Sequence, residues 1–330
     1  MRIARIVDST VAPPLAEGRF AGVVMVAKDG RPVFAKGYGL ADRERRIAHT
    51  PATPFMIMSV SKQFTAAVIA RLAVAGKLRF EDHVSMYLED WPASWSDVQI
   101  RHLLSHSSGL PIDTAYSWLV KHHPEFWPGS APPPPYEPLD LPAPPGTKYQ
   151  YANVGYTLLT LIAAKAGGAP FDELLREEVV RPLALEHTVP ERNGIRIPGR
   201  ARGYQKSASG LELKEQKTID IVGAGDLVST ASDLVRFDAA FDDDRFVPAS
   251  IMLTPKIEGA RGASIGYGWF VRTSPRGRRL QYHTGDGAGF RAFNFRVPDK
   301  HLAVVVLSNV HESDVPWIVP LVDRIADAMR

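Results

Sequence analysis

Alternating and apolar runs near both ends of the chain predict β-strands. Residues 22–28 and 32–38 flank Asp29-Gly30, a dipeptide typical of tight turns, and so predict a β-hairpin. In the last third, short runs rich in β-branched and aromatic residues predict strands at 264–272, 279–283, 290–297 and 302–307. The last of these runs is apolar at every position, which favours a central strand buried on both faces.

Helical periodicity dominates the region between these strands. Apolar patterns predict helices over residues 61–75, 156–166, 172–180 and 232–241, and a last one within 313–330. The first two end at glycines, as many helices do. We therefore expect one α+β domain over residues 1–330. An antiparallel sheet from residues 1–55 and 250–330, flanked by helices, would lie beside a mainly helical lobe of residues 56–249, with the active site in the seam.

Residues 111–145 differ from the rest of the chain in composition. They hold 11 of the 27 prolines together with Trp118, Trp127 and Tyr136. Proline disfavours both helix and sheet interiors, so we expect neither here. The aromatic residues favour an extended loop over the mouth of the site; a linker between independent domains is the alternative.

Composition narrows the possible chemistry. The 330 residues include no cysteine, which excludes disulfides, thiol catalysis and thiolate metal ligands. The formal net charge is only +3, and the basic runs at 43–46 and 276–279 are short, which favours solvated loops over nucleic-acid binding. No apolar run approaches the roughly 20 residues of a membrane span. The first residues lack the apolar core of a secretory signal, so we expect a cytoplasmic protein, or a periplasmic one if a leader has been removed.

The tetrapeptide Ser59-Val60-Ser61-Lys62 opens the first predicted helix. Residues three apart lie on the same helix face, so the Ser59 hydroxyl and the Lys62 amine would be neighbours. A serine hydroxyl is a weak nucleophile until a base removes its proton, and a desolvated lysine can act as that base. The pair predicts a covalent serine hydrolase, although the spacing alone also occurs by chance.

Tyr151-Ala152-Asn153 precedes another predicted helix. A phenol and an amide two residues apart on a loop can point into one cavity, the phenol to relay a proton and the amide to orient substrate. The alternative is structural, with Asn153 as a helix cap and Tyr151 in the core.

His283-Thr284-Gly285, followed by Asp286, closes a predicted strand. Glycine at a strand edge allows a substrate to approach the backbone, and a free N–H there can stabilise an oxyanion. The alternative is an ordinary hairpin with glycine turns.

Two further patterns match known chemistry less well. Ser264 lies in a Gly-x-Ser-x-Gly sequence, but a strand follows it where a nucleophile elbow requires a helix. His102 and His106 have the i, i+4 spacing of zinc ligands, without a glutamate between them or a third ligand at a telling spacing. We expect neither a second nucleophile nor a metal site.

Taken in order, Ser59-x-x-Lys62, Tyr151-x-Asn153 and His283-Thr284-Gly285 resemble the serine β-lactamase and penicillin-binding-protein superfamily. The similarity is greatest to its class C β-lactamase-like branch, which includes family VIII carboxylesterases, DD-peptidases and D-aminopeptidases. The flanking segments 57–65, 103–110, 151–156 and 223–231 agree. The resemblance implies the β-lactamase/transpeptidase-like fold and no metal or organic cofactor.

The same resemblance implies a role for each motif residue. Ser59 would carry the acyl group, with Lys62 and Tyr151 sharing the proton transfers. Asn153 and His283 would contact substrate, and the backbone N–H groups of Ser59 and Asp286 would form the oxyanion hole beside Gly285.

One departure from the family pattern bears on the substrate. Histidine stands at 283, where β-lactamases carry a lysine that helps bind the carboxylate of the drug. An unperturbed histidine is mostly uncharged at neutral pH, so we expect a neutral substrate. The first hypothesis is a carboxylesterase of short acyl esters. The second is a D-amino-acid peptidase or amidase, or a penicillin-recognising DD-peptidase or β-lactamase. The third is a non-catalytic binding or assembly module.

Overall fold

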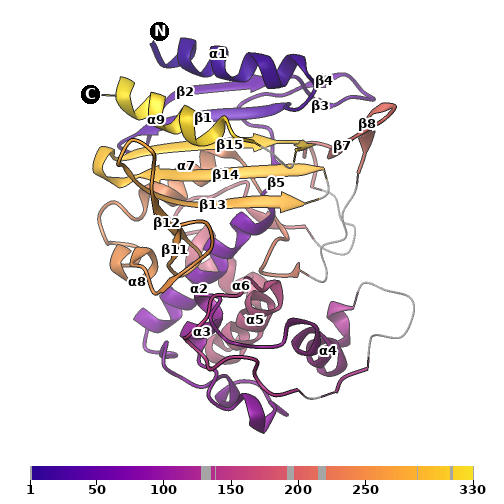
Figure 1. Ribbon diagram of the computed structural model, residues 1–330, viewed down its shortest axis with the longest axis vertical. Helices are drawn as coiled ribbons and strands as arrows, with labels where there is room; N and C mark the ends of the chain where they lie inside the picture. The colour runs from indigo at the N-terminus through magenta and orange to yellow at the C-terminus, as the bar shows by residue number, and fades with distance from the viewer. Residues whose placement is uncertain are drawn as a thin grey trace.

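A large antiparallel sheet, built from both ends of the chain, forms the upper part of the molecule (Figure 1). The computed structural model describes residues 2–127, 135–137, 139–191, 197–214, 221–287, 289–312 and 315–329. The eight strands of the large sheet run in the order β10-β11-β12-β13-β14-β15-β1-β2. They are β1 (Gly22–Lys28), β2 (Arg31–Tyr38), β10 (Ile257–Glu258), β11 (Ser264–Ile265), β12 (Phe270–Thr273), β13 (Arg279–Gly287), β14 (Phe290–Val297) and β15 (Leu302–Ser308). The expected α+β architecture, with an antiparallel sheet built from the N- and C-terminal strands, is confirmed.

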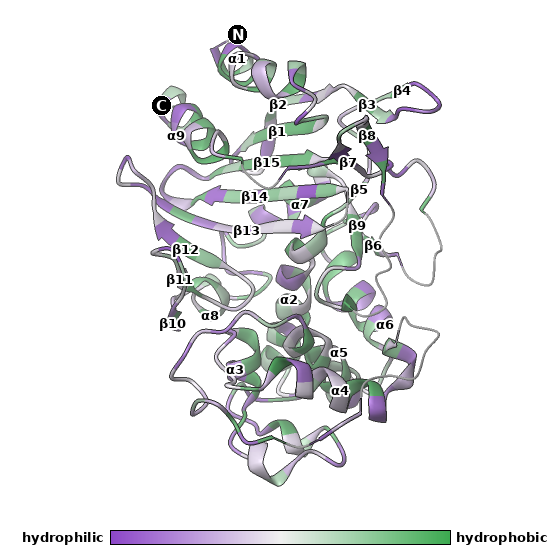
Figure 2. Ribbon diagram, turned by 45° about the vertical axis from the view of Figure 1, so that its right-hand side comes forward, coloured by the Kyte–Doolittle hydropathy of each residue, from purple (hydrophilic) through white to green (hydrophobic). Residues whose placement is uncertain are grey.

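The predicted hairpin joins β1 to β2. Asp29 and Gly30 both adopt positive φ, 51° and 70°, as a tight turn between antiparallel strands requires. On its other side β1 pairs with β15, so the N-terminal hairpin joins the C-terminal strands within the sheet. Every residue of β15 is buried, and its side chains alternate between two separate hydrophobic cores. The expectation of a central strand at 302–307 is therefore confirmed, and Figure 2 shows hydrophobic residues along this part of the sheet.

Two helices, α1 (Arg2–Ala16) and α9 (Ile318–Ala328), cover the outer face of the sheet (Figure 1). Apolar residues of both helices pack with alternate residues of β1, β14 and β15. The sequence pattern indicated α9, although residues 313–314 of its predicted range lie outside the described residues. It did not reveal α1, whose last turns contain Pro13 and Pro14.

The inner face of the sheet rests on a helical lobe. Its central helix, α2 (Ser61–Val74), is buried on nearly all sides and packs against α5 (Asn153–Gly167). Gly76 and Gly168 end these helices with φ of 71° and 75°, as the sequence pattern predicted. The other helices are α3 (Ile100–Leu104), α4 (Ile112–His122), α6 (Phe171–Leu175), α7 (Ala231–Ala239) and α8 (Ala249–Leu253).

Smaller strands connect the two layers. A second sheet contains β5 (Phe55–Met56), β9 (Leu227–Ser229) and β6 (Val189–Pro190), and a third contains β16 (Val310–His311), β7 (Tyr204–Ser207) and β8 (Gly210–Leu213). β3 (Leu40–Asp42) pairs with β4 (Ile47–Ala48). β5 lies directly before, and β9 directly after, a segment that contributes to the site described below.

Three expectations about local structure need correction. Residues 111–145 are not free of helix, because the eleven residues of α4 lie between Pro111 and Pro124 and contain no proline. Trp118 is fully buried in α4, and its indole ring packs edge-on against that of Trp91, so it belongs to the core of the lobe. Residues 128–134 and 138 of this segment lie outside the described residues.

The other two corrections concern the sheet. The run 264–272 is not one strand, because Gly268 adopts φ of 75° and separates β11 from β12. The strand predicted at 279–283 continues to Gly287 and so includes the whole His-Thr-Gly motif.

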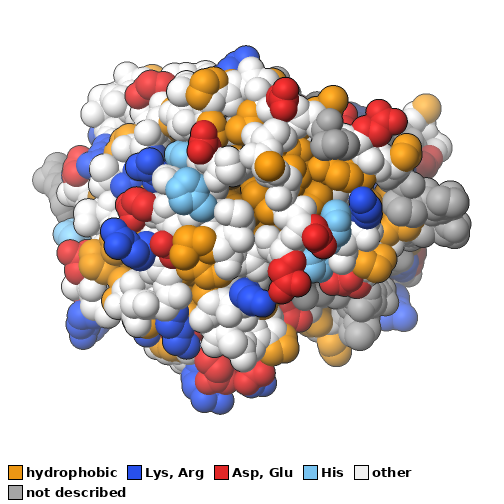
Figure 3. Space-filling model, turned by 90° about the horizontal axis from the view of Figure 1, so that it is seen from below, with side chains coloured by type: hydrophobic (Ala, Val, Ile, Leu, Met, Phe, Trp, Pro, Cys, Tyr) orange, Lys and Arg blue, Asp and Glu red, His pale blue; other side chains and the backbone are white. Residues whose placement is uncertain are grey.

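The surface and the helices bear on where the protein could make contacts. Viewed from below, the molecule carries side chains of both charges scattered around an area of hydrophobic ones (Figure 3). Among the described residues, no helix has the length and apolar character needed to cross a membrane.

Candidate active site

Ser59 lies where the sheet meets the helical lobe. It belongs to a short 3₁₀ helix, Met58–Val60, which leads directly into α2. Met58 adopts φ of 49°, the left-handed region that non-glycine residues rarely enter. A strained residue directly before a candidate nucleophile is typical of functional sites, because the surrounding structure must hold it in place.

Gly285 explains how the sheet comes so close to this turn. A Cβ atom at residue 285 would lie 2.1 Å from the carbonyl oxygen of Ile57, far inside van der Waals contact. β13 therefore packs directly on the backbone that carries Ser59. The glycine was expected to admit a substrate; it is needed first to admit the protein's own chain.

Lys62 is fully buried one turn after Ser59. Its Nζ lies 3.1 Å from Ser59 Oγ, 2.8 Å from Asn153 Oδ1 and 2.7 Å from the carbonyl oxygen of Ala224. Burial holds the pKa of Lys62 well below its usual range, while the nearby Asp226 opposes this shift. The amine is thus placed to exist in its neutral form.

The geometry of these contacts specifies what a neutral Lys62 amine would do. It has two N–H groups and one lone pair. The oxygens of Asn153 and Ala224 can only accept, so they take the two N–H groups. The remaining partner, the Ser59 hydroxyl, can donate, and the lone pair is left to receive its proton.

Tyr151 lies next to both Ser59 and Lys62. Burial raises the pKa of its phenol, and a hydrogen bond to Ser59 opposes that shift. Lys62 Nζ lies 4.8 Å from the centre of the Tyr151 ring. The phenol therefore stays protonated at neutral pH, which suits a group that relays a proton rather than one that begins as a base.

Asn153 is the first residue of α5, and the N-cap position before it is held by Ala152. The Asn153 Oδ1 accepts a hydrogen bond from Lys62 Nζ, and the residue is exposed. Asn153 therefore does not stand at the capping position, and its contact with substrate stays a prediction.

His283 faces the site from β13 and is only 2 % exposed. Its Nδ1 lies 2.8 Å from the carbonyl oxygen of Thr284, so Nδ1 carries the proton and donates. Burial, with a contribution from nearby Lys62, lowers the pKa of His283 to about 3. The imidazole is therefore uncharged at neutral pH.

Asp286 extends beyond the part of β13 that pairs with β12. β12 pairs only as far as Tyr282, which leaves residues 283–287 with β14 alone and their other edge near the Ser59 turn. The Asp286 side chain forms ion pairs with Arg291 and with His311. Its backbone N–H stays a predicted oxyanion donor, and the neighbouring Ala288 lies outside the described residues.

Sequence reasoning missed two parts of the site. The first is the Ala224 carbonyl, which no side-chain motif could reveal; only its position in the family-like segment 223–231 was a signal. The second is His106, whose ring lies 4.3 Å from that of Tyr151 and whose Nδ1 accepts from the Ala152 N–H. It thereby supports Tyr151 from behind.

The two weaker patterns do not form sites. Ser264 lies in β11 rather than at a strand-to-helix turn, and its hydroxyl donates to Glu258. His106 lies beyond the end of α3 with φ of 54°, so it does not share a helix face with His102. Within the described ranges no group of three or more potential metal ligands occurs.

Comparison with known proteins identifies the family of the chain. A sequence model of the Beta-lactamase family matches residues 7–318. "Penicillin-binding protein 4*" of Bacillus subtilis (strain 168) is 27% identical over 319 residues, which cover 89% of this chain and 69% of that protein.

Solved structures share the fold over nearly the whole chain. The octameric penicillin-binding protein homologue from Pyrococcus abyssi superposes with a TM-score of 0.81 at 26% identity, covering 98% of this chain and 76% of the other. D-amino acid amidase from Ochrobactrum anthropi SV3 gives 0.81 at 21% identity, covering 99% of both chains. The hydrolase EstCE1 gives 0.78 at 21%, covering 99% and 98%. With a family match over most of its length, the chain belongs to the Beta-lactamase family of serine hydrolases.

Proposed function

We propose that the protein hydrolyses short acyl esters through an acyl-enzyme on Ser59. The observation that carries this proposal is the set of three contacts around the buried Lys62 Nζ, to Ser59 Oγ, Asn153 Oδ1 and the Ala224 carbonyl oxygen. In the neutral amine, the last two take the N–H groups, and the lone pair is available to the Ser59 hydroxyl.

The steps follow from these positions. Ser59 Oγ attacks the substrate carbonyl while its proton passes to Lys62 Nζ. Tyr151 then gives a proton to the departing alcohol oxygen and is reprotonated through Lys62. Water hydrolyses the ester on Ser59 by the reverse order of transfers. Backbone N–H groups of Ser59 and Asp286 would bind the oxyanion, an arrangement in which losing one donor typically costs about 10²–10³ in rate.

An ester is the first candidate because His283 is uncharged and does not supply, at residue 283, the cation of the family's usual lysine. The second candidate is a D-amino-acid amidase or a penicillin-recognising enzyme. It is supported by the 27% identity to "Penicillin-binding protein 4*". A non-catalytic role is disfavoured, because Ser59, Lys62 and Tyr151 are all present and lie together.

A side-by-side substrate panel tests the proposal. p-Nitrophenyl acetate and butyrate, a D-amino amide and a cephalosporin are each incubated with the wild type, with Ser59→Ala and with Ser264→Ala. We expect turnover of the esters by the wild type and Ser264→Ala, and none by Ser59→Ala.

Other results would redirect the assignment. Hydrolysis of the amide but not the esters, or a stable penicilloyl adduct on Ser59 in the intact mass, favours the second candidate. A protein that leaves every substrate intact and whose Ser59 resists a fluorophosphonate probe is not a hydrolase. Loss of activity in Ser264→Ala instead would move the nucleophile.

A further inference from the structure

The outer face of the sheet carries a groove of about 500 Å³ beside the candidate active site. Cross-strand register places its floor on one face: Phe270 opposes Tyr282, Tyr282 opposes Phe295, and Thr284 opposes Phe293. One wall is formed by Val315 and Pro316, which precede α9, and by Ile318 and Val319 in its first turn. The groove is therefore separate from the buried contacts of Lys62, which lie on the inner face.

At one end the groove is lined by residues that adjoin the candidate active site. Thr284, which lines it, directly follows His283. Phe270, also in its lining, has its ring 4.9 Å from that of His283. Tyr149 closes this end, two residues before Tyr151 in the chain. A substrate bound at Ser59 could therefore extend one of its ends into the groove.

Positive charge in the groove comes from three arginines. Arg261, Arg272 and Arg291 line it, and none of its lining residues is acidic. Arg291 forms an ion pair with Asp286. Arg261 and Arg272 have no ion pair within the described part of the chain, and guanidinium groups stay protonated at any physiological pH.

Arg272 is held in place without being neutralised. Its guanidinium lies 5.9 Å from the centre of the Tyr282 ring and interacts with the hydroxyl of that residue, while its Nε is buried without a hydrogen-bond partner. Buried donors without partners are rare in proteins. Because this Nε is itself buried, a ligand in the groove would meet the terminal amino groups of the guanidinium.

We propose that this groove binds a carboxylate on the substrate, so that the preferred esters carry an anionic group at the end of a short aliphatic or aryl chain. The aromatic floor would contact the chain, and Arg261 and Arg272 would contact the carboxylate, as guanidinium groups bind carboxylates with paired hydrogen bonds. This inference rests on the proposed hydrolase function. The uncharged His283 led us to expect a neutral substrate, and the proposed groove changes this expectation to an anionic one. The positive charge comes from Arg272 on β12 and from Arg261, and not from residue 283 on β13.

Matched ester pairs test the inference on the intact protein. On the acyl side, mono-p-nitrophenyl glutarate is compared with its methyl ester. On the alcohol side, the butyrate ester of 3-hydroxybenzoate is compared with that of 3-hydroxybenzamide. We expect the wild type to prefer the charged member of one pair, which then identifies the side that enters the groove.

The variant carrying Arg261→Gln and Arg272→Gln should lose about 10- to 100-fold in kcat/KM for that charged ester, the usual range for hydrogen bonds to a charged group. Its kcat/KM for the uncharged ester should stay within about twofold, since no reacting group changes. Arg31→Gln, a change of an exposed arginine on β2, is the matched control and should alter neither. Added salt should reduce the preference of the wild type for the charged ester.

Equal rates for the two members of both pairs, or a double variant that loses both members equally, would overturn the groove assignment and leave the proposed esterase intact. If no ester is turned over, the proposed function fails, and the groove is then tested by calorimetry on the Ser59→Ala protein with benzoate and benzamide. Tighter binding of benzoate that disappears in the double arginine variant supports the groove. Equal binding or no binding refutes it.

Discussion

The basic side chains near the two faces of β13 differ in their state of charge. On the inner face, burial lowers the pKa of both Lys62 and His283, so each basic group is held near its uncharged form. On the outer face, Arg261 and Arg272 lie along an open groove as permanent cations. Adjacent residues on one strand thus face a dry site suited to proton transfer and a charged one suited to recognition.

The difference follows from side-chain chemistry as much as from burial. An amine or imidazole can escape the cost of desolvation by releasing its proton, and it then becomes a base. A guanidinium cannot release its proton in a protein, so it stays a charge wherever it is placed. Proton transfer therefore requires the lysine inside, while anion binding is served by arginines outside.

The strongest test of the inner face is Lys62→Ala. Removing the group that accepts the Ser59 proton should lower kcat by about 10²–10⁴-fold, the range typical of general-base catalysis, measured with p-nitrophenyl butyrate. Lys77→Ala, at an exposed position just after α2, is the control and should be unchanged. Near-normal activity of Lys62→Ala would remove this residue from the mechanism.

The pH profile of the wild type tests whether Lys62 acts in its neutral form. Activity should rise with pH as Lys62 loses its proton, and the rise should end well below 10.5, the usual pKa of a lysine, because burial lowers the pKa of Lys62. His283 is already neutral above about pH 3, so it should contribute no further step near neutrality. A rise that continues to the pKa of a free lysine would contradict the picture of a desolvated amine.

Gly285→Ala tests how tightly the inner face is packed. The new Cβ would meet the Ile57 carbonyl oxygen at 2.1 Å, so β13 and the Ser59 turn must move apart. We expect the free energy of unfolding to fall by about 1–3 kcal/mol, as for other overpacked sites. Activity should fall by about 10²-fold, because small displacements of reacting groups cost rate steeply. Urea unfolding and ester kinetics measure the two effects.

Gly155→Ala is the matched control, since its Cβ would meet Leu103 at an ordinary 3.7 Å. If both glycine variants behave alike, close approach of β13 is not what Gly285 provides.

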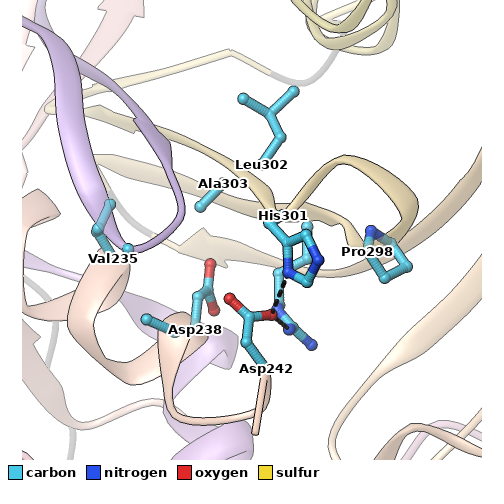
Figure 4. A pocket seen from close by; sticks show the side chains of 10 residues that line it. Val235, Asp238, Asp242, Pro298, His301, Leu302 and Ala303 are labelled. Atoms are coloured by element: carbon cyan, nitrogen blue, oxygen red, sulfur yellow. Dashed lines mark hydrogen bonds and ion pairs between the residues drawn. The ribbon is translucent and has the colours of Figure 1, made fainter. Parts of the chain in front are cut away.

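The smallest effect concerns a buried carboxyl below the same sheet. Asp238 of α7 accepts from the Asn294 amide, which also donates to Gln63, the residue after Lys62. Figure 4 shows Asp238 beside Asp242, whose carboxylate is paired with Arg296 and His301. Burial raises the pKa of Asp238 to about 7, although Arg296 opposes the shift.

A raised carboxyl pKa gives stability a defined pH dependence. Between pH 4 and 7 this carboxyl is ionised in the unfolded chain but protonated in the folded one, so its contribution to stability falls as pH rises through this window. Asp238→Asn should remove that fall, as measured by urea unfolding from pH 4 to 8. Asp299→Asn, at an exposed site, should keep it. An unchanged pH dependence in Asp238→Asn would show that this carboxyl ionises normally.

Local sequence signals were sufficient for much of the fold. The Asp29-Gly30 turn, the apolar run of β15 and the glycines that end α2 and α5 each act through near neighbours in the chain. The absence of helix expected for residues 111–145 was wrong because it rested on the composition of the whole segment. In 111–145 the prolines surround α4 without entering it, and local helix formation depends on the residues inside the helix.

By itself, the sequence determined the family-like motifs and the segments at both ends of the chain that form the sheet. It also determined the pairing of Ser59 with Lys62, because one helical turn separates the two residues. Only the tertiary structure decided what those residues became. The Ala224 carbonyl, the contact of Gly285 with Ile57 and the groove of Arg261 and Arg272 join segments far apart in the chain. Protonation states were decided there too, because desolvation depends on everything packed around a group and not on its neighbours in sequence.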